Sequence, residues 1–212
     1  MHDPAITIIL SRTQTKFGRC IRKVARQQYN HASVALDDGL EEVYAFARPS
    51  RYDLLSGRLV RERRDRFTMG NGRPVPVAVY RIPVTQVQAH WVRATVRTMA
   101  EDPEYLYNLF SVLTYPVLKG FSVWKAYSCV EFAAFLLRSL GLLGEEKPLC
   151  SYRPDDLASL LADHLVYRGD IRDCLPPTAD EGYFAHPTPS MVTQGLWSLA
   201  RITKRSVSAL VG

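Results

Sequence analysis

The chain has 212 residues, of which 47% are apolar and 23% are charged, and it contains only 12 Gly and 13 Pro. This composition excludes collagen-like chains, linkers and disordered acidic tails, and it supplies enough apolar side chains for a hydrophobic core. We therefore expect a single domain over residues 1–212. Since the sequence shows neither an apolar leader nor a run of about 20 apolar residues, we also expect a cytoplasmic protein without a transmembrane segment.

The formal charge of +6 comes largely from clusters of basic residues in the first third of the chain. A basic surface attracts anions without selecting among nucleic acid, lipid headgroups and acidic polymers. The clusters therefore predict either an anionic ligand on a basic face or a face that is simply solvated. They consist of Arg19, Arg22, Lys23 and Arg26, and of Arg58, Arg61, Arg63, Arg64 and Arg66.

Four cysteines, Cys20, Cys129, Cys150 and Cys174, are scattered along the chain without a CxxC pair. A chain of this size folds without disulfide bonds, and zinc sites usually show closely spaced pairs of ligands. We therefore expect reduced thiols, no disulfide framework, no metal site and no cofactor.

In chain order, the first predicted strand covers residues 5–10, where β-branched side chains are frequent. Apolar residues at helical spacing then predict an amphipathic helix over 16–28. Two β-prone runs, 30–36 and 40–47, flank an Asp-Gly step and predict a hairpin with a tight turn. This places His31 near the start of the hairpin's first strand.

The next segment, 48–76, is rich in Arg, Gly and Pro and predicts a loop insertion with one short strand at most. A strand at 77–84 and a helix at 85–99 follow, and 105–118 is predicted to be helical up to Tyr115-Pro116. After the segment around Cys129, we expect a helix at 155–164, a strand within 165–174, and a helical C-terminal extension at 176–212 with its main helix over 191–210.

Residues 127–141 carry the most informative pattern of the chain. Ser128 followed three residues later by Glu131 is a capping box, in which each side chain accepts a hydrogen bond from the other residue's backbone amide. Cys129 thus becomes the first helical residue. Free amides and the helix dipole stabilise a thiolate there, which lowers the thiol pKa below its reference value of about 8.5. Gly141 ends the helix.

Each of these residues has a simpler interpretation when it is taken alone. A free cysteine is most often a small buried apolar side chain, and a strand histidine is commonly satisfied by a backbone carbonyl or by water. The catalytic interpretation depends on the pair, because a histidine on the sheet can take the proton of a helix-start cysteine while a third group orients the ring. We predict Cys129 as the nucleophile and His31 as its base.

The order of the two segments, with the His31 strand early and the Cys129 helix near residue 130, resembles the circularly permuted NlpC/P60 superfamily of papain-like proteins. That superfamily includes bacterial YiiX-like proteins and the lecithin retinol acyltransferase and phospholipase/acyltransferase relatives. The resemblance covers residues 6–140 and implies an α+β fold, in which the nucleophile helix packs against an antiparallel sheet. It also implies a thiol hydrolase or acyltransferase, with Cys129 and His31 at the family's nucleophile and base positions.

The third site residue of that family is a polar side chain on the strand that follows the histidine strand. If the Asp-Gly step forms a two-residue turn, Glu42 and Tyr44 lie on the same face of the sheet as His31. We select Tyr44 as the orienting residue because its hydroxyl can hydrogen-bond an imidazole. Glu42 is chemically the more usual partner, and ordinary strand packing is the simpler interpretation of Tyr44. A loop that differs by one residue would move both side chains to the other face.

The predicted chemistry is attack of Cys129 on an acyl carbonyl, which gives a thioester that water or an amine resolves. The leading hypothesis is a thiol hydrolase, an amidase or peptidase whose substrate is a peptide or another acyl-containing molecule. A lipid acyltransferase or thioesterase on the same fold is the second hypothesis. The third is a non-catalytic binding module with a basic face, which predicts steep salt dependence and indifference to thiol alkylation. An intact fold with a decayed site is the fourth. The natural substrate and the oligomeric state stay open.

Overall fold

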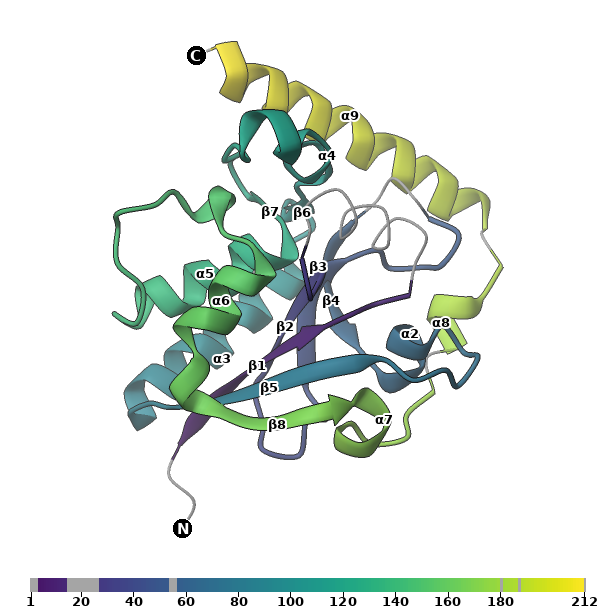
Figure 1. Ribbon diagram of the computed structural model, residues 1–212. Coiled ribbons are helices and arrows are strands. Elements are labelled where there is room, and N and C mark those ends of the chain that lie inside the picture. Colours follow the sequence, from purple (N-terminus) through teal and green to yellow (C-terminus); the bar gives the residue numbers. More distant parts are fainter. Residues whose placement is uncertain (1–3, 15–26, 54–56, 180, 187, 212) are drawn as a thin grey trace.

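The computed structural model describes residues 4–14, 27–53, 57–179, 181–186 and 188–211. As predicted, the fold is α+β, with a curled sheet and helices packed around it (Figure 1). The described strands form one sheet in the order β7-β6-β4-β3-β2-β1-β5-β8. Their bounds are Ala5–Ser11 (β1), His31–Ala35 (β2), Val43–Ala47 (β3), Arg58–Glu62 (β4), Pro76–Pro83 (β5), Leu106–Tyr107 (β6), Ala126–Tyr127 (β7) and Leu165–Asp170 (β8).

Neighbouring strands of this sheet run antiparallel except β6 and β7, where Leu106 pairs with Ala126 in parallel. The expectation of an antiparallel sheet is therefore wrong at this edge, and the sheet is mixed. The two-residue strand β7 is separated from α5 by Ser128 alone. The parallel pair consequently helps to fix the place where the Cys129 helix begins.

The helices lie between and after the strands. The predicted helix at 16–28, with Cys20 and the first basic cluster, falls almost entirely outside the described residues. The α-helices are Arg64–Thr68 (α2), Gln86–Glu101 (α3), Leu109–Leu118 (α4), Cys129–Ser139 (α5), Pro154–Leu160 (α6), Ile171–Cys174 (α7), Glu181–Phe184 (α8) and Pro189–Val211 (α9), and two short 3-10 helices cover Leu149–Ser151 and Ala162–His164.

Both faces of the sheet are covered. Ile8 and Leu10 of β1 point into a core that also contains the buried side chains of α3, α5 and α6. Ile9 points the other way, into a smaller core with Phe67 of α2 and Ile171 of α7. Successive strand residues alternate between faces, so a strand covered on both sides has an almost continuous apolar sequence. This explains why residues 5–10 already indicated a strand.

The segment 48–76, predicted to be a loop insertion, contributes an inner strand and a helix to the fold. β4 lies between β3 and β6, and α2 follows it directly. Along β4, Leu59 and Glu62 are buried while Arg58 and Arg61 are exposed. β4 is the one short strand that the prediction allowed in this segment, whereas α2 was not predicted. A buried carboxylate and two exposed arginines conceal the apolar alternation that would have identified β4 clearly.

The loop after β2 is longer than predicted. Leu36 N donates to Glu42 O at 3.0 Å, so the connection covers residues 37–41. The Asp37 carboxylate closes this loop by accepting hydrogen bonds from two backbone amides at its far end. As a result Val34 pairs with Tyr44. The predicted two-residue turn would have shifted this pairing by one residue, which places every β3 side chain on the opposite face.

The segment 105–118 also differs from its prediction at both ends. Its first residues form β6, and α4 then runs through Pro116 to Leu118. The Asn108 side chain starts the helix by accepting a hydrogen bond from Ser111 N at 3.2 Å. The C-terminal extension contains α8 and the 23-residue α9. Neither α9 nor another helix of the described ranges is long and apolar enough to cross a membrane.

Candidate active site

Cys129 is the first residue of α5, as the capping-box pattern predicts. Ser128 Oγ accepts a hydrogen bond from Glu131 N at 3.1 Å, and the Glu131 carboxylate accepts one from Ser128 N at 3.2 Å. The following turn is anchored by Phe132 and Ala133, which are fully buried against the sheet. The thiol is therefore held at a rigid helix start, and only 6% of Cys129 is exposed.

His31 is the first residue of β2, and its imidazole faces Glu62, the last residue of β4. His31 Nε2 lies 3.1 and 3.0 Å from the two carboxylate oxygens of Glu62. Ser33 Oγ donates to the same carboxylate at 2.6 Å. Because Nε2 is hydrogen-bonded to Glu62, Nδ1 is the ring nitrogen that remains to exchange a proton with a thiol. Glu62 is thus placed to orient the imidazole.

The sheet register explains how Glu62 reaches a histidine two strands away. Glu62 pairs with Val43 of β3, and Val43 pairs with Ala35 of β2. Directly paired residues share a face of the sheet, and so do residues two apart along one strand. Glu62, Ser33 and His31 therefore project from the same face, and this common face brings the carboxylate to the ring.

The prediction of Tyr44 as the orienting residue is wrong. Tyr44 pairs with Val34 and packs on the core between the sheet and α5. Its side chain therefore projects from the face of the sheet opposite to that of the His31 side chain. Glu42, the alternative, is the last residue before β3 and forms an ion pair with Arg97 at 3.2 Å. Both errors have one physical cause, the five-residue loop in place of the two-residue turn.

Cys129 belongs to the core on the other face of the sheet, and it interacts with His31 at the end of β2 that β3 leaves unpaired. β2 pairs with β1 from His31 to Ala35, but with β3 only at Val34 and Ala35. α5 packs against both β2 and β3. The Ala32 amide, on the same unpaired stretch of β2, lies near enough to the Cys129 sulfur to lower the thiol pKa. This backbone group adds to the effect expected of the helix-start amides.

The three side chains shift one another's pKa values. Burial has the largest effect on Cys129 and would raise its pKa, yet the charge and hydrogen bonding of His31 and the Ala32 amide hold the thiol pKa below its ordinary value. Burial would lower the pKa of His31, but the charges of Glu62 and Cys129 raise it well above its usual range. The Glu62 pKa is lowered by His31 despite burial. These directions favour a thiolate, an imidazolium and a carboxylate.

Tyr107, which the sequence analysis did not select, lies close enough to Cys129 to interact with its charge. Burial and the Cys129 charge raise the Tyr107 pKa, and the Arg48 guanidinium opposes them. Tyr107 is held by β6, where it pairs with Tyr127, two residues before Cys129, and donates its backbone N–H to Gly57 O at 2.7 Å. A tyrosine in an aromatic stretch carries no sequence signal for a place beside Cys129, because it looks like core packing.

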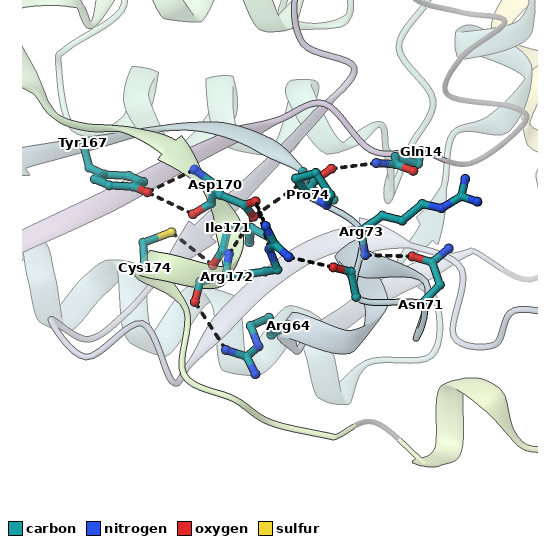
Figure 2. A network of polar contacts seen from close by, with 12 residues as sticks. Gln14, Arg64, Asn71, Arg73, Pro74, Tyr167, Asp170, Ile171, Arg172 and Cys174 are labelled. Carbon is teal, nitrogen blue, oxygen red and sulfur yellow. Dashed lines mark hydrogen bonds and ion pairs between the residues drawn. The ribbon is translucent and has the colours of Figure 1, made fainter.

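The other two cysteines of the described residues have different surroundings. Burial raises the pKa of Cys174 to about 11, and its sulfur lies 3.5 Å from Ile171 O, beside a network that joins Asp170, Arg172 and Tyr167 (Figure 2). Burial also raises the pKa of Cys150. In the described part of the chain no three His, Cys, Asp or Glu side chains gather as metal ligands would.

The fold therefore brings a thiol, an imidazole and a carboxylate close enough to interact. Cys129 and His31, selected from the sequence, are brought together, while Glu62 takes the place intended for Tyr44. Comparison of this chain with protein-family models, with curated proteins and with solved structures finds no match.

Proposed function

We propose that this protein is a thiol hydrolase that cleaves an acyl bond, foremost an amide, through a thioester on Cys129. The observation that carries the proposal is the Cys129–His31–Glu62 arrangement, in which the nucleophile, the base and the orienting carboxylate come from three separate elements. The permuted order, with the histidine strand before the cysteine helix, supports a papain-like scaffold of the NlpC/P60 kind.

In the first step the Cys129 thiolate attacks the carbonyl carbon of the substrate. The Cys129 amide and the Tyr107 hydroxyl are the two groups proposed to donate hydrogen bonds to the oxygen that becomes negative. As the bond to nitrogen breaks, the His31 imidazolium gives its proton to the departing amine. The amine leaves, the acyl group stays on sulfur as a thioester, and His31 is neutral.

In the second step a water molecule attacks the thioester carbonyl. Neutral His31 takes the water proton, the carbon–sulfur bond breaks, and the Cys129 thiolate and the imidazolium are restored. Glu62 stays ionised throughout, holding Nε2 and stabilising the imidazolium without accepting its proton. An amine or alcohol that replaces water in this step would give acyl transfer by the same residues.

The experiment that tests the proposal is alkylation of the intact protein with iodoacetamide across a range of pH, followed by peptide mass mapping. Cys129 should react fastest and should begin to react at a lower pH than Cys150 and Cys174, because its pKa alone among the three is lowered. Incubation with an activated aryl ester should then give a mass increase of one acyl group on the Cys129 peptide. Cys129→Ala is the matched control and should carry no acyl group.

Equal reactivity of the three thiols in the folded protein, or an acyl group on Cys150 or Cys174 instead of Cys129, would refute the proposal. A Cys129 that is alkylated early but is never acylated would show a reactive thiol without hydrolase activity. That result would favour the inactive-scaffold hypothesis.

A further inference from the structure

The long C-terminal helix α9 exposes an apolar stripe to solvent. Its inner side, with Gly195, Ile202 and Ser206, is buried against the rest of the molecule. A second set of apolar residues recurs at spacings of four or eleven residues, which places them on one side of the helix, within an arc of about 100°, over about 30 Å. This exposed line contains Val192, Leu196, Val207 and Val211, with Trp197 beside it.

The helix α4 lies alongside α9 (Figure 1) and adds further exposed apolar side chains. Phe110 of α4 and Leu199 of α9 pack on the same small core, so the two helices are held together from beneath. On its outer side α4 exposes Leu113, Val117 and Leu118. We refer to these residues, the α9 line, Trp197 and Trp124 as the α4–α9 face.

Both tryptophans of the α4–α9 face are exposed, Trp124 by 65% and Trp197 by 70%. A soluble protein rarely leaves so many large apolar side chains exposed on two neighbouring helices unless they bind something. Tryptophan is enriched where an apolar phase meets water, because the ring is apolar and its N–H is a donor.

The charge beside these tryptophans is positive. A groove of about 780 Å³ between them is lined by Arg201, Lys204 and Arg205, and by no carboxylate. The Arg205 guanidinium stacks 4.7 Å from the centre of the Trp124 ring. Glu104 pairs with Arg201 at 3.0 Å from outside the groove and offsets one charge. No acidic residue occurs within α9, so the groove keeps a net positive charge.

We infer that the α4–α9 face binds an anionic membrane surface, with α9 lying in the plane of the interface. An amphipathic helix with an apolar line, aromatic side chains and flanking cations has the features of an interfacial helix. Its apolar side chains would enter the boundary between headgroups and acyl chains, and its cations would meet lipid phosphates. This inference is independent of the thiol chemistry proposed above.

Two other occupants fit the face less well. A second copy of this chain docked on the same face by two-fold symmetry would bring like charges of the two grooves together. A nucleic acid would use the cations and tryptophans but would leave the aliphatic line of α9 and the outer side of α4 exposed. A membrane accounts for the cations, the tryptophans and the aliphatic side chains at once.

The test is co-sedimentation of the full chain with vesicles of phosphatidylcholine alone and of phosphatidylcholine mixed with phosphatidylglycerol. Binding should require phosphatidylglycerol and should weaken as salt is added. The chain has three tryptophans, and two of them belong to the face. In a Trp91→Phe/Trp124→Phe variant the remaining Trp197 fluorescence should shift to shorter wavelength on binding and should be quenched by brominated acyl chains.

Paired variants separate the face from general surface effects. Lys204→Glu should weaken binding at least about fivefold, since one basic residue near an anionic leaflet contributes about that factor. Arg73→Glu changes net charge equally on the exposed segment between α2 and β5, outside the α4–α9 face, and should have little effect. Leu196→Ser/Val207→Ser should weaken binding about tenfold or more, because apolar burial is lost. Val87→Ser on α3 is its exposed control. Circular dichroism verifies the fold of each variant.

Three results would overturn the inference. The first is equal binding to both kinds of vesicle, and the second is no loss of binding in Lys204→Glu and Leu196→Ser/Val207→Ser. The third is evidence for another occupant. A dimer seen in sedimentation velocity, and lost in the Leu196→Ser/Val207→Ser variant, would identify a second copy of the chain. Binding to single-stranded DNA that Lys204→Glu weakens, in a protein that ignores vesicles, would identify nucleic acid.

Discussion

Cys129 and Cys174 are thiols in helices of the same protein, and burial acts on both in the same direction, yet their pKa values move apart. Cys129 begins α5 beside His31, and its pKa is lowered. Cys174 ends α7 beside the carboxylates of Asp170 and Asp173, and its pKa is raised to about 11. Burial acts to raise the pKa of both thiols, and only Cys129 has a cation and hydrogen-bond donors beside its sulfur that outweigh burial. The groups that face the sulfur therefore decide which cysteine becomes reactive.

The largest expected effect is that of His31→Ala. Without the imidazolium, burial dominates and the Cys129 pKa rises, so alkylation at neutral pH should fall about a hundredfold. Ester hydrolysis should fall about a thousandfold, because the proton carrier is also lost. In the unmodified protein, hydrolysis should rise with pH through the lowered Cys129 pKa and decline again through the raised His31 pKa. Rates of alkylation and of ester hydrolysis against pH measure both effects.

Cys174 is the internal control for this variant, since its surroundings do not include His31. Its alkylation rate should be unchanged. If Cys129 keeps its early reaction in His31→Ala, the helix start and the Ala32 amide are sufficient to activate the thiol. The histidine would then have no part in the difference between the two cysteines.

The second prediction separates thiol activation from stabilisation of the transition state. Tyr107→Phe removes the hydroxyl proposed to stabilise the oxyanion but leaves the ring, so ester hydrolysis should fall about a hundredfold. Alkylation by iodoacetamide forms no oxyanion, and the Cys129 rate should stay within about twofold. The ratio of the two rates is the diagnostic measurement. Equal losses in both would mean that Tyr107 only shapes the thiol environment.

The sequence predicted the parts of the site that depend on local signals. A capping box is contained in four consecutive residues, which is why the position of Cys129 at the helix start is confirmed. The strand that carries His31 also has a local signal in its β-prone residues. The α+β class follows from several such segments taken together.

The third member of the site depended on information that is not local. The face on which a β3 side chain lies is set by the length of the preceding loop. The Asp37 carboxylate stabilises a five-residue loop by accepting hydrogen bonds from the amides of Glu41 and Glu42. Glu62 lies in a strand that its own charged residues conceal. Nothing in the sequence near Glu62 shows that this residue lies opposite Val43 and reaches His31 across β3, because strand pairing is a property of the folded chain.

The third prediction concerns this carboxylate. Glu62→Gln keeps the shape of the side chain and removes the charge that raises the His31 pKa. The imidazolium should lose its proton at lower pH, so the high-pH decline of ester hydrolysis should move downward by about one pH unit and the rate should fall about tenfold. The pH profile of hydrolysis measures the shift. An unchanged high-pH limit would show that Glu62 is a structural partner of Ser33 and His31 only.

The smallest expected effect on cysteine alkylation is that of Glu131→Gln, which should separate Cys129 from Cys150. Glutamine preserves the capping box. The largest influences on the Cys129 pKa are burial, His31, the Ala32 amide and Glu62, whereas the Glu131 charge raises the Cys150 pKa. Alkylation of Cys150 should therefore become a few times faster at pH 8, and that of Cys129 should not change.

The same substitution has a larger effect on stability, with a definite sign. Burial raises the Glu131 pKa to about 7, so the folded state binds the proton more tightly than the unfolded state. The stability from this proton is complete below the unfolded pKa and is lost as pH rises to 7, by about 3 kcal/mol. Urea unfolding should show this loss in the unmodified protein but not in Glu131→Gln, which should be the more stable of the two at pH 8. If both proteins lose stability equally, Glu131 does not titrate in this range, and the helix start that holds Cys129 is insensitive to pH.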